Sequence, residues 1–135
     1  MRQNKYILED GDVLFARSGN TVGKTFLYKS SFGKAIYAGY LIRFKPLKEI
    51  LLPKFLEILT KGDVYKKWVA DSQTGSSQPN INGQLYSNFM IPVPPLTEQE
   101  KIVQQIEILE TQIAQAQKII DDAPQQKQAV LQKYL

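Results

Sequence analysis

Residues 97–122 read TEQEKIVQQIEILETQIAQAQKIIDD, and this stretch decides the architecture that the sequence predicts. Its apolar residues recur at intervals of four and three, which is the a/d pattern of a coiled coil. We therefore assign helix pairing to the residues at these positions: Ile102, Ile106, Leu109, Ile113, Ala116 and Ile120. A helix lying flat on its own sheet usually shows a wider apolar face, and it is the alternative interpretation of this pattern.

Both ends of this helix are marked in the sequence. Thr97 and Glu100 have the spacing of a capping box, in which the two side chains satisfy free amides of the first turn. A helix from Thr97 to Asp122 would be about 39 Å long, and we expect it to protrude from a compact body. Pro124 follows, so we expect residues 125–135 to form a short helical tail that cannot cover the apolar seam.

The residues ahead of this helix predict a small mixed sheet with two short helices. Strand character occurs in four segments, the third of them largely buried: Asp12–Arg17, Gly23–Lys29, Ala35–Lys45 and Phe89–Val93. Apolar residues recur at helical spacing after Pro53 and again over Val64–Val69, which predicts two short helices. Residues 72–84 are polar and contain glycine, so we expect a loop there. The predicted fold class is α+β, with a mixed-sheet domain in residues 1–96 and the coiled-coil helix with its tail in residues 97–135.

The chain of 135 residues contains neither cysteine nor histidine, and this excludes most enzyme classes. Thiolate chemistry and Ser-His or Cys-His pairs are ruled out, and zinc would have to be held by carboxylates alone. We therefore expect no catalytic residue, no metal and no cofactor in this chain. No apolar run reaches the roughly 20 residues that span a bilayer, and the start lacks a signal-peptide core, so we expect a cytoplasmic protein.

The net charge of +4 is unevenly distributed. Residues 1–96 carry 13 basic and 7 acidic side chains, whereas residues 97–135 carry 4 and 6. Seven basic residues and no acidic one lie between Val13 and Lys48. Basic side chains gathered on one face favour a phosphate backbone as the partner, although a solvated basic strand face is the alternative.

Two motifs invite enzymatic interpretations that their residues disfavour. Gly19–Thr25 resembles a nucleotide-binding loop, but three residues separate its glycines where that pattern has four, and a strand follows in place of a helix. Nucleotide hydrolysis stays an alternative. A turn that presents Lys24 and backbone amides to a DNA phosphate would use the same chemistry less specifically. Val93–Leu96 shares the prolines of the amino-methyltransferase motif, but Val93 and Leu96 replace both of its working side chains.

Basic, hydroxyl and amide side chains are the candidates for DNA contact. Basic residues position phosphates, and Asn or Gln can read adenine through its base edge. Among the aromatic residues between Phe26 and Phe44, we expect most to pack in the strand core and Tyr37 and Tyr40 to be exposed. The DNA-binding candidates are Arg17, Ser18, Asn20, Lys24, Lys29, Lys34, Tyr37, Arg43, Ser76, Gln78 and Asn80.

Five motifs occur in a fixed order along the chain: Gly11–Gly19, Gly23-Lys24, Tyr40–Arg43, the Gly75–Asn82 loop and Ile91–Gln99. So arranged, they resemble the specificity (S) subunit of type I restriction-modification enzymes. The most specific part is the Pro-Pro-Leu-x-Glu-Gln junction of residues 94–99, which leads into the heptad helix. The resemblance covers about residues 10–135, including the closing segment Lys127–Leu135.

This resemblance implies a non-catalytic target-recognition domain that reads half of a bipartite DNA sequence. It also implies that the long helix pairs antiparallel with a counterpart, from a second S half or from another copy of this chain. The partners implied are double-stranded DNA, methyltransferase (M) subunits that use S-adenosylmethionine, and motor-nuclease (R) subunits that use ATP and magnesium. The shared stretches Gly11–Leu14 and Gly75–Gln78 would then be framework or phosphate contacts more than base readers.

The chain also departs from the family pattern. A full specificity subunit has two recognition domains and two helices, whereas this chain has one of each, and its domain starts late, at Leu8–Arg17. We therefore expect a C-terminal fragment, a truncated gene product or a recombination cassette. The alternative function is a helix-mediated interaction module that does not bind DNA itself.

Overall fold

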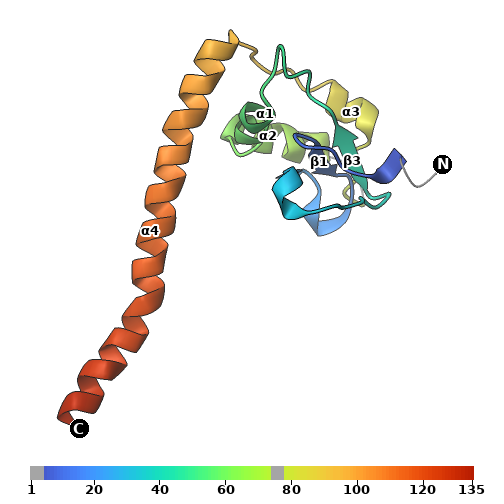
Figure 1. The fold of residues 1–135 in the computed structure, drawn as a ribbon. Helices are drawn as coiled ribbons and strands as arrows, with labels where there is room; N and C mark the ends of the chain where they lie inside the picture. Colours follow the sequence, from blue (N-terminus) through green and yellow to red (C-terminus); the bar gives the residue numbers. More distant parts are fainter. Residues whose placement is uncertain (1–4, 74–77) are drawn as a thin grey trace. The chain divides into compact units, whose positions relative to one another are not determined.

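The computed structural model describes residues 5–73 and 78–135 of the chain, which form two compact units. The first unit comprises residues 1–100 and the second residues 101–135. Because helix α4 (Leu96–Tyr134) begins in the first unit and makes up nearly all of the second, the change of unit falls just inside this helix. The predicted α+β class, a small sheet with helices and a long C-terminal helix, is confirmed (Figure 1).

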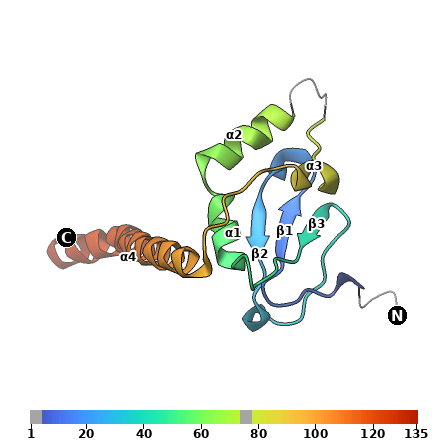
Figure 2. The ribbon, with the colours of Figure 1, turned by 90° about the horizontal axis from the view of Figure 1, so that it is seen from above.

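A three-stranded antiparallel sheet is the centre of the first unit. Strand β1 (Val13–Ala16) lies between β2 (Thr25–Leu27) and β3 (Leu41–Phe44), as Figure 2 shows. In the register, Leu14 is opposite both Phe26 and Arg43. The first two strands fall within the segments that the sequence predicts.

The third and fourth predicted strands need correction. Only Leu41–Phe44 of the third segment joins the sheet, because a turn closed by the Leu41 amide and the Ala38 carbonyl at 3.0 Å precedes it. Ile36, farther back, makes an isolated bridge with Ile7. Residues 89–93 are not a strand, since Pro92 has no amide to donate and Pro94 and Pro95 follow it.

The central strand β1 is buried on both faces of the sheet, and its side chains alternate between two cores. Val13 and Phe15 face a core built with α2 (Asp63–Ser72) and α3 (Gly83–Ser87). Leu14 faces the other way and packs with Leu8 and Tyr28 in a second, smaller core. All four residues of β1 are buried, so the strand is a rigid base for the residues that follow it.

Among the described residues, three α-helices precede the long one, and Gly19–Thr21 and Ser30–Phe32 each form a single 3-10 turn. Helix α1 (Pro53–Leu59) begins with proline at its first position, as predicted, and α2 matches the second predicted helix. Helix α3 lies at the end of the segment we expected to be a loop, where the Asn82 side chain accepts a hydrogen bond from the Leu85 amide at 2.8 Å and caps the helix. Five residues are too short to show a helical period in the sequence.

Gln99 fixes the beginning of α4, and the predicted capping box is wrong. The helix begins at Leu96, so Thr97 lies inside its first turn, and the Pro95 carbonyl accepts from the amides of Glu98 and Gln99. The Gln99 side chain is completely buried. Its amide nitrogen donates to the carbonyls of Ile50 and Pro94, both at 2.8 Å, and its oxygen accepts from the Leu52 amide at 2.9 Å.

The helix also does not end before Pro124. Helix α4 passes through this proline and continues to Tyr134, so residues 125–135 are its continuation and not a separate tail. A proline inside a helix removes one hydrogen bond, and the intact turns on either side carry the helix across the gap. At 39 residues, α4 is about 59 Å long.

Candidate nucleic-acid interface

Two segments that are distant in the sequence, both with polar or basic residues, pair through their backbones where β1 ends. Ser18 and Asn80 form an isolated antiparallel bridge. On either side of it, the Gly19 amide donates to the Pro79 carbonyl at 3.3 Å and the Ile81 amide donates to the Arg17 carbonyl at 2.7 Å. We call the polar and basic residues of these segments, with Lys24 where the β1–β2 connection ends, the β1-end surface: Arg17, Ser18, Asn20, Lys24, Gln78 and Asn80.

This surface is accessible although its backbone is firmly held. Arg17 is partly exposed and the other five residues are exposed. Directly behind Asn80, Ile81 is completely buried in the core beneath the sheet. Burial of Ile81 therefore anchors the backbone at Asn80 beside Arg17 and Ser18. Sequence reasoning missed this anchor, because a single isoleucine in a polar segment has no period.

Two buried tyrosines hold the connection between β1 and β2. The Tyr65 hydroxyl donates to the Gly23 carbonyl at 2.5 Å, and the Tyr86 hydroxyl donates to the Ala16 carbonyl at 2.6 Å while accepting from the Gly23 amide at 3.0 Å. Burial raises the pKa of both tyrosines, so their hydroxyls stay protonated at neutral pH. This network positions Arg17 and Lys24 at the two ends of the turn.

Gly23 is required at this turn for two reasons. Its φ of +86° lies in the left-handed region that other residues avoid. A Cβ added here would lie 2.6 Å from Val69 Cγ1 on α2, which is too close for two carbon atoms. The glycine therefore serves close packing of the turn against α2, and the strand that follows confirms that this is not a loop opening onto a helix.

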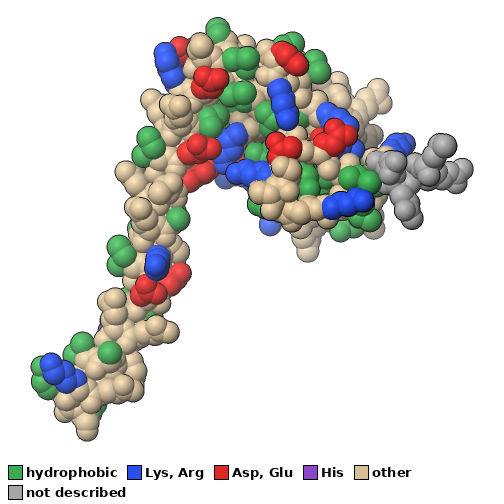
Figure 3. Space-filling model, viewed as in Figure 1, with side chains coloured by type: hydrophobic (Ala, Val, Ile, Leu, Met, Phe, Trp, Pro, Cys, Tyr) green, Lys and Arg blue, Asp and Glu red, His purple; other side chains and the backbone are tan. Residues whose placement is uncertain are grey.

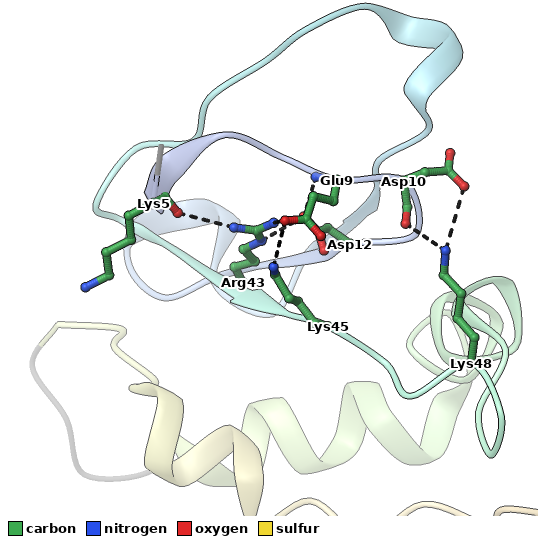
Figure 4. A network of polar contacts seen from close by, with 7 residues as sticks. All are labelled: Lys5, Glu9, Asp10, Asp12, Arg43, Lys45 and Lys48. Atoms are coloured by element: carbon green, nitrogen blue, oxygen red, sulfur yellow. Dashed lines mark hydrogen bonds and ion pairs between the residues drawn. The ribbon is translucent and has the colours of Figure 1, made fainter. Parts of the chain in front are cut away.

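Arg43 is not available as a phosphate contact, contrary to the prediction, because its side chain is paired in the interior. Its side chain is 9% exposed and its guanidinium pairs with Asp12, which is 4% exposed, with Nη2 and Oδ2 2.6 Å apart. Nε donates to the same oxygen at 2.7 Å, and Nη1 donates to the Lys5 carbonyl at 3.2 Å (Figure 4). Asp12 also accepts from the Glu9 amide at 2.7 Å. Arg43 is therefore an internal counterion and does not face solvent phosphates.

The acid-free stretch between Val13 and Lys48 is partly neutralised by acids that precede it. Lys45 lies 3.0 Å from Glu9, and Lys48 lies 4.0 Å from Asp10. The Lys45 ammonium holds the pKa of Glu9 below its usual value, and the Ser30 amide lowers the pKa of Asp10. Within the described residues, ion pairs therefore take up three of the seven basic side chains.

The remaining basic candidates do not lie together. Arg17 and Lys24 belong to the β1-end surface, whereas Lys29 follows β2 at the opposite end of the sheet, beside Ser30, whose amide donates to Asp10. Lys34 lies between Gly33, which accepts from the Tyr28 hydroxyl, and Ala35, which accepts from the Leu8 amide. The structure thus divides the predicted phosphate contacts into separate places.

The aromatic candidates and the polar loop gave a mixed result. Tyr40 is exposed, as expected, but Tyr37 is partly buried, 5.6 Å from the Tyr6 ring and 5.9 Å from the Arg43 guanidinium. Phe26 and Phe32 are exposed and contact each other, although we expected core packing. Ser76 lies outside the described residues.

Apolar side chains lie along the surface of α4 (Figure 3), and four of the six predicted pairing residues are exposed. Leu109, Ile113 and Ile120 are 53%, 68% and 62% exposed, and Ala116 is exposed too, while Ile102 and Ile106 are partly buried. Because the helix continues past Pro124, the same spacing extends to Ala123, Val130 and Tyr134, with Lys127 as the polar interruption. Pairing through this seam stays a prediction.

A metal cluster and a membrane-spanning helix are both absent from the part of the chain that the structure describes. No group of three metal-ligating side chains occurs in residues 5–73 and 78–135. Across the same residues, no helix is both long and apolar enough to span a membrane.

Comparison with known sequences identifies one family. The type I restriction modification DNA specificity domain matches residues 1–125. The chain is 26% identical over 128 residues to the type I restriction enzyme MjaVIII specificity subunit of Methanocaldococcus jannaschii, covering 94% of this chain and 28% of that protein. It is 31% identical over 111 residues to the EcoKI specificity subunit of Escherichia coli, covering 78% of this chain and 24% of that protein.

Solved structures agree with the sequence relatives. The HsdS subunit from Thermoanaerobacter tengcongensis superimposes with a TM-score of 0.71 at 25% identity, covering 87% of this chain and 30% of that one. A chain from a study of complex assembly and conformational transition in the type I R-M system gives a TM-score of 0.72 with the same coverage. The present chain thus spans less than a third of the length of these relatives.

Proposed function

Because the chain belongs to the family of type I restriction-modification DNA specificity domains, we propose that its first unit binds double-stranded DNA and reads base sequence through the β1-end surface. The observation that carries this proposal is the bridge between Ser18 and Asn80. It brings the exposed residue Asn80 next to the segment that carries Arg17, Ser18 and Asn20, and amide and basic residues are the combination that base readout with phosphate positioning requires.

The side chains divide into two roles in this proposal. Arg17 and Lys24 contact phosphates and set the register of the protein on the duplex. Asn20, Gln78 and Asn80 can each present a donor and an acceptor to a base edge, and Ser18 adds a hydroxyl. Lys29, Lys34 and Tyr37 lie elsewhere on the unit, and the proposal does not depend on them.

The chain supplies recognition and its partners supply chemistry. We propose that methyltransferase subunits holding S-adenosylmethionine, and motor-nuclease subunits using ATP and magnesium, act at the DNA that this unit selects. The family assignment and the lack of cysteine and histidine support this division of labour.

Titration of labelled duplex DNA tests the phosphate part of the proposal. We expect salt-sensitive binding by the wild-type chain, and for Arg17→Gln a slope of log affinity against log salt that is lower by about one. Lys118→Gln, an exposed lysine of α4 with the same charge change, is the control and should bind like the wild type. No salt-sensitive binding by the wild-type chain, or equal slopes for the two variants, would contradict the proposal.

The exposed seam of α4 favours a second function, pairing with another helix. We expect the chain to self-associate and the double variant Ile106→Asp/Ile113→Asp to lose at least about a hundredfold in association constant, since burying each isoleucine is worth about 1.5–3 kcal/mol. Sedimentation or light scattering gives the oligomeric state. The control is Gln105→Asp/Gln112→Asp, which places the same charges at exposed positions with the same spacing. An oligomer that persists in the isoleucine variant would disprove pairing through this seam.

A further inference from the structure

A second basic site lies next to the β1-end surface, in a groove between the β1–β2 connection and the corner of α1 and α2. Figure 2 shows α2 beside this connection. One wall runs from Val22 to Thr25, and the other is formed by Thr60, Lys61, Tyr65, Lys66 and Val69. The groove has a volume of about 230 Å³.

Direct contacts hold the two walls together. The hydroxyls of Thr25 and Thr60 are hydrogen-bonded at 2.6 Å. The Lys61 ammonium reaches across to the Thr25 carbonyl at 3.5 Å, and the Tyr65 hydroxyl donates to the Gly23 carbonyl. Because both walls belong to packed elements of the first unit, the groove is a preformed feature with a buried base at Tyr65 and Val69.

The rim of the groove carries three exposed lysines: Lys24, Lys61 and Lys66. The residues that line it include no aspartate or glutamate. Within the described residues, the lysines that form ion pairs are others, such as Lys45, Lys54 and Lys67. Three ammonium groups around one groove repel one another, and an anion bound between them relieves that repulsion.

We infer that this lysine groove binds the sugar-phosphate backbone of the DNA duplex, beyond the base pairs that the β1-end surface reads. The inference rests on the proposed function and extends it to Lys61 and Lys66, which the sequence did not single out. Lys24 belongs to both sites, so one backbone strand that contacts Arg17 and Lys24 continues along the groove. Contacts of this kind add affinity without adding sequence preference.

The test compares two double variants that remove the same charge. Lys61→Gln/Lys66→Gln removes two of the three lysines of the groove, whereas Lys118→Gln/Lys133→Gln removes two exposed lysines of α4 that lie outside the pairing seam. In titrations with a labelled duplex, we expect the groove variant to reduce the log–log salt slope by about two relative to the wild type. The affinity gained by lowering salt from about 200 to 50 mM would then shrink about tenfold for any duplex sequence, with the α4 variant unchanged.

Each outcome separates this inference from the proposed function. If Arg17→Gln weakens binding but Lys61→Gln/Lys66→Gln matches the wild type, the groove inference is wrong and the proposed function stands. If the wild-type chain binds no duplex, the proposed function fails first. If a polyglutamate peptide binds the wild type and not the groove variant, while both bind DNA equally, the groove takes an acidic protein segment and the inference is overturned.

Discussion

Replacing Gln99 with glutamate is expected to destabilise the first unit by about 4 kcal/mol at neutral pH. The change preserves the shape of the side chain but replaces the NH₂ group, which donates to the Ile50 and Pro94 carbonyls, with an oxygen. The new carboxyl is fully buried and faces two carbonyl oxygens, so its charged form is strongly disfavoured.

The loss from Gln99→Glu should depend on pH in a defined direction. Burial raises the pKa of the new carboxyl above its unfolded value of about 4.3, so the penalty is small below that pH and grows as the pH rises. Thermal or denaturant unfolding at pH 4 and pH 7 measures this. The control is Gln104→Glu, at an exposed position of the same helix, which should change stability by less than about 0.5 kcal/mol. Equal unfolding midpoints for the two variants at pH 7 would show that Gln99 does not fix the start of α4.

Replacing Asp12 with alanine is expected to cost about 3–5 kcal/mol. Two groups lose their partner: the nearly buried Arg43 guanidinium and the Glu9 amide. The guanidinium keeps the Lys5 carbonyl, the Tyr37 ring at 5.9 Å and a 3.6 Å approach to Glu9. A charge left in the interior without its counterion is far more costly than the loss of an exposed pair.

A matched comparison separates burial from charge in this prediction. Asp71→Ala breaks the exposed pair with Lys67, whose Nζ lies 2.6 Å from the Asp71 carboxylate, and should cost less than about 1 kcal/mol. Adding Arg43→Met to Asp12→Ala should recover part of the loss, because the uncompensated charge is then gone. If the Asp12→Ala and Asp71→Ala variants unfold at the same denaturant concentration, the claim that Arg43 and Asp12 form a buried ion pair is contradicted.

The long helix and the first two strands could be predicted from sequence because their signals are local. The spacing from Ile102 to Ile120 needs only the 3.5-residue period, and proline at Pro53 marks a helix start without any distant partner. The prediction that the helix ends before Pro124 is wrong, since a proline stops a helix only where the surrounding turns do not compensate for it.

The candidate site could be predicted only in part. Arg17, Asn20 and Lys24 are neighbours in sequence, but their meeting with Asn80 depends on a pairing across the fold that no local pattern shows. In the sequence, Arg43 looks like any surface arginine, and only its contact with Asp12 in the folded chain shows that it lies in the interior. Gln99 illustrates the same limit, because one buried amide joins three backbone groups from two other segments.

The central claim is that the β1-end surface reads DNA sequence, and selection from a randomised duplex pool tests it most directly. The pool bound by the wild-type chain should become enriched in a short motif, and Asn80→Ala should relax the preference at one position of that motif, since a good base contact is worth about 1–3 kcal/mol. Gln104→Ala, on the exposed side of α4, should leave the motif unchanged. A pool that is retained without enrichment of any motif, or a motif identical for the wild type and Asn80→Ala, would contradict the account.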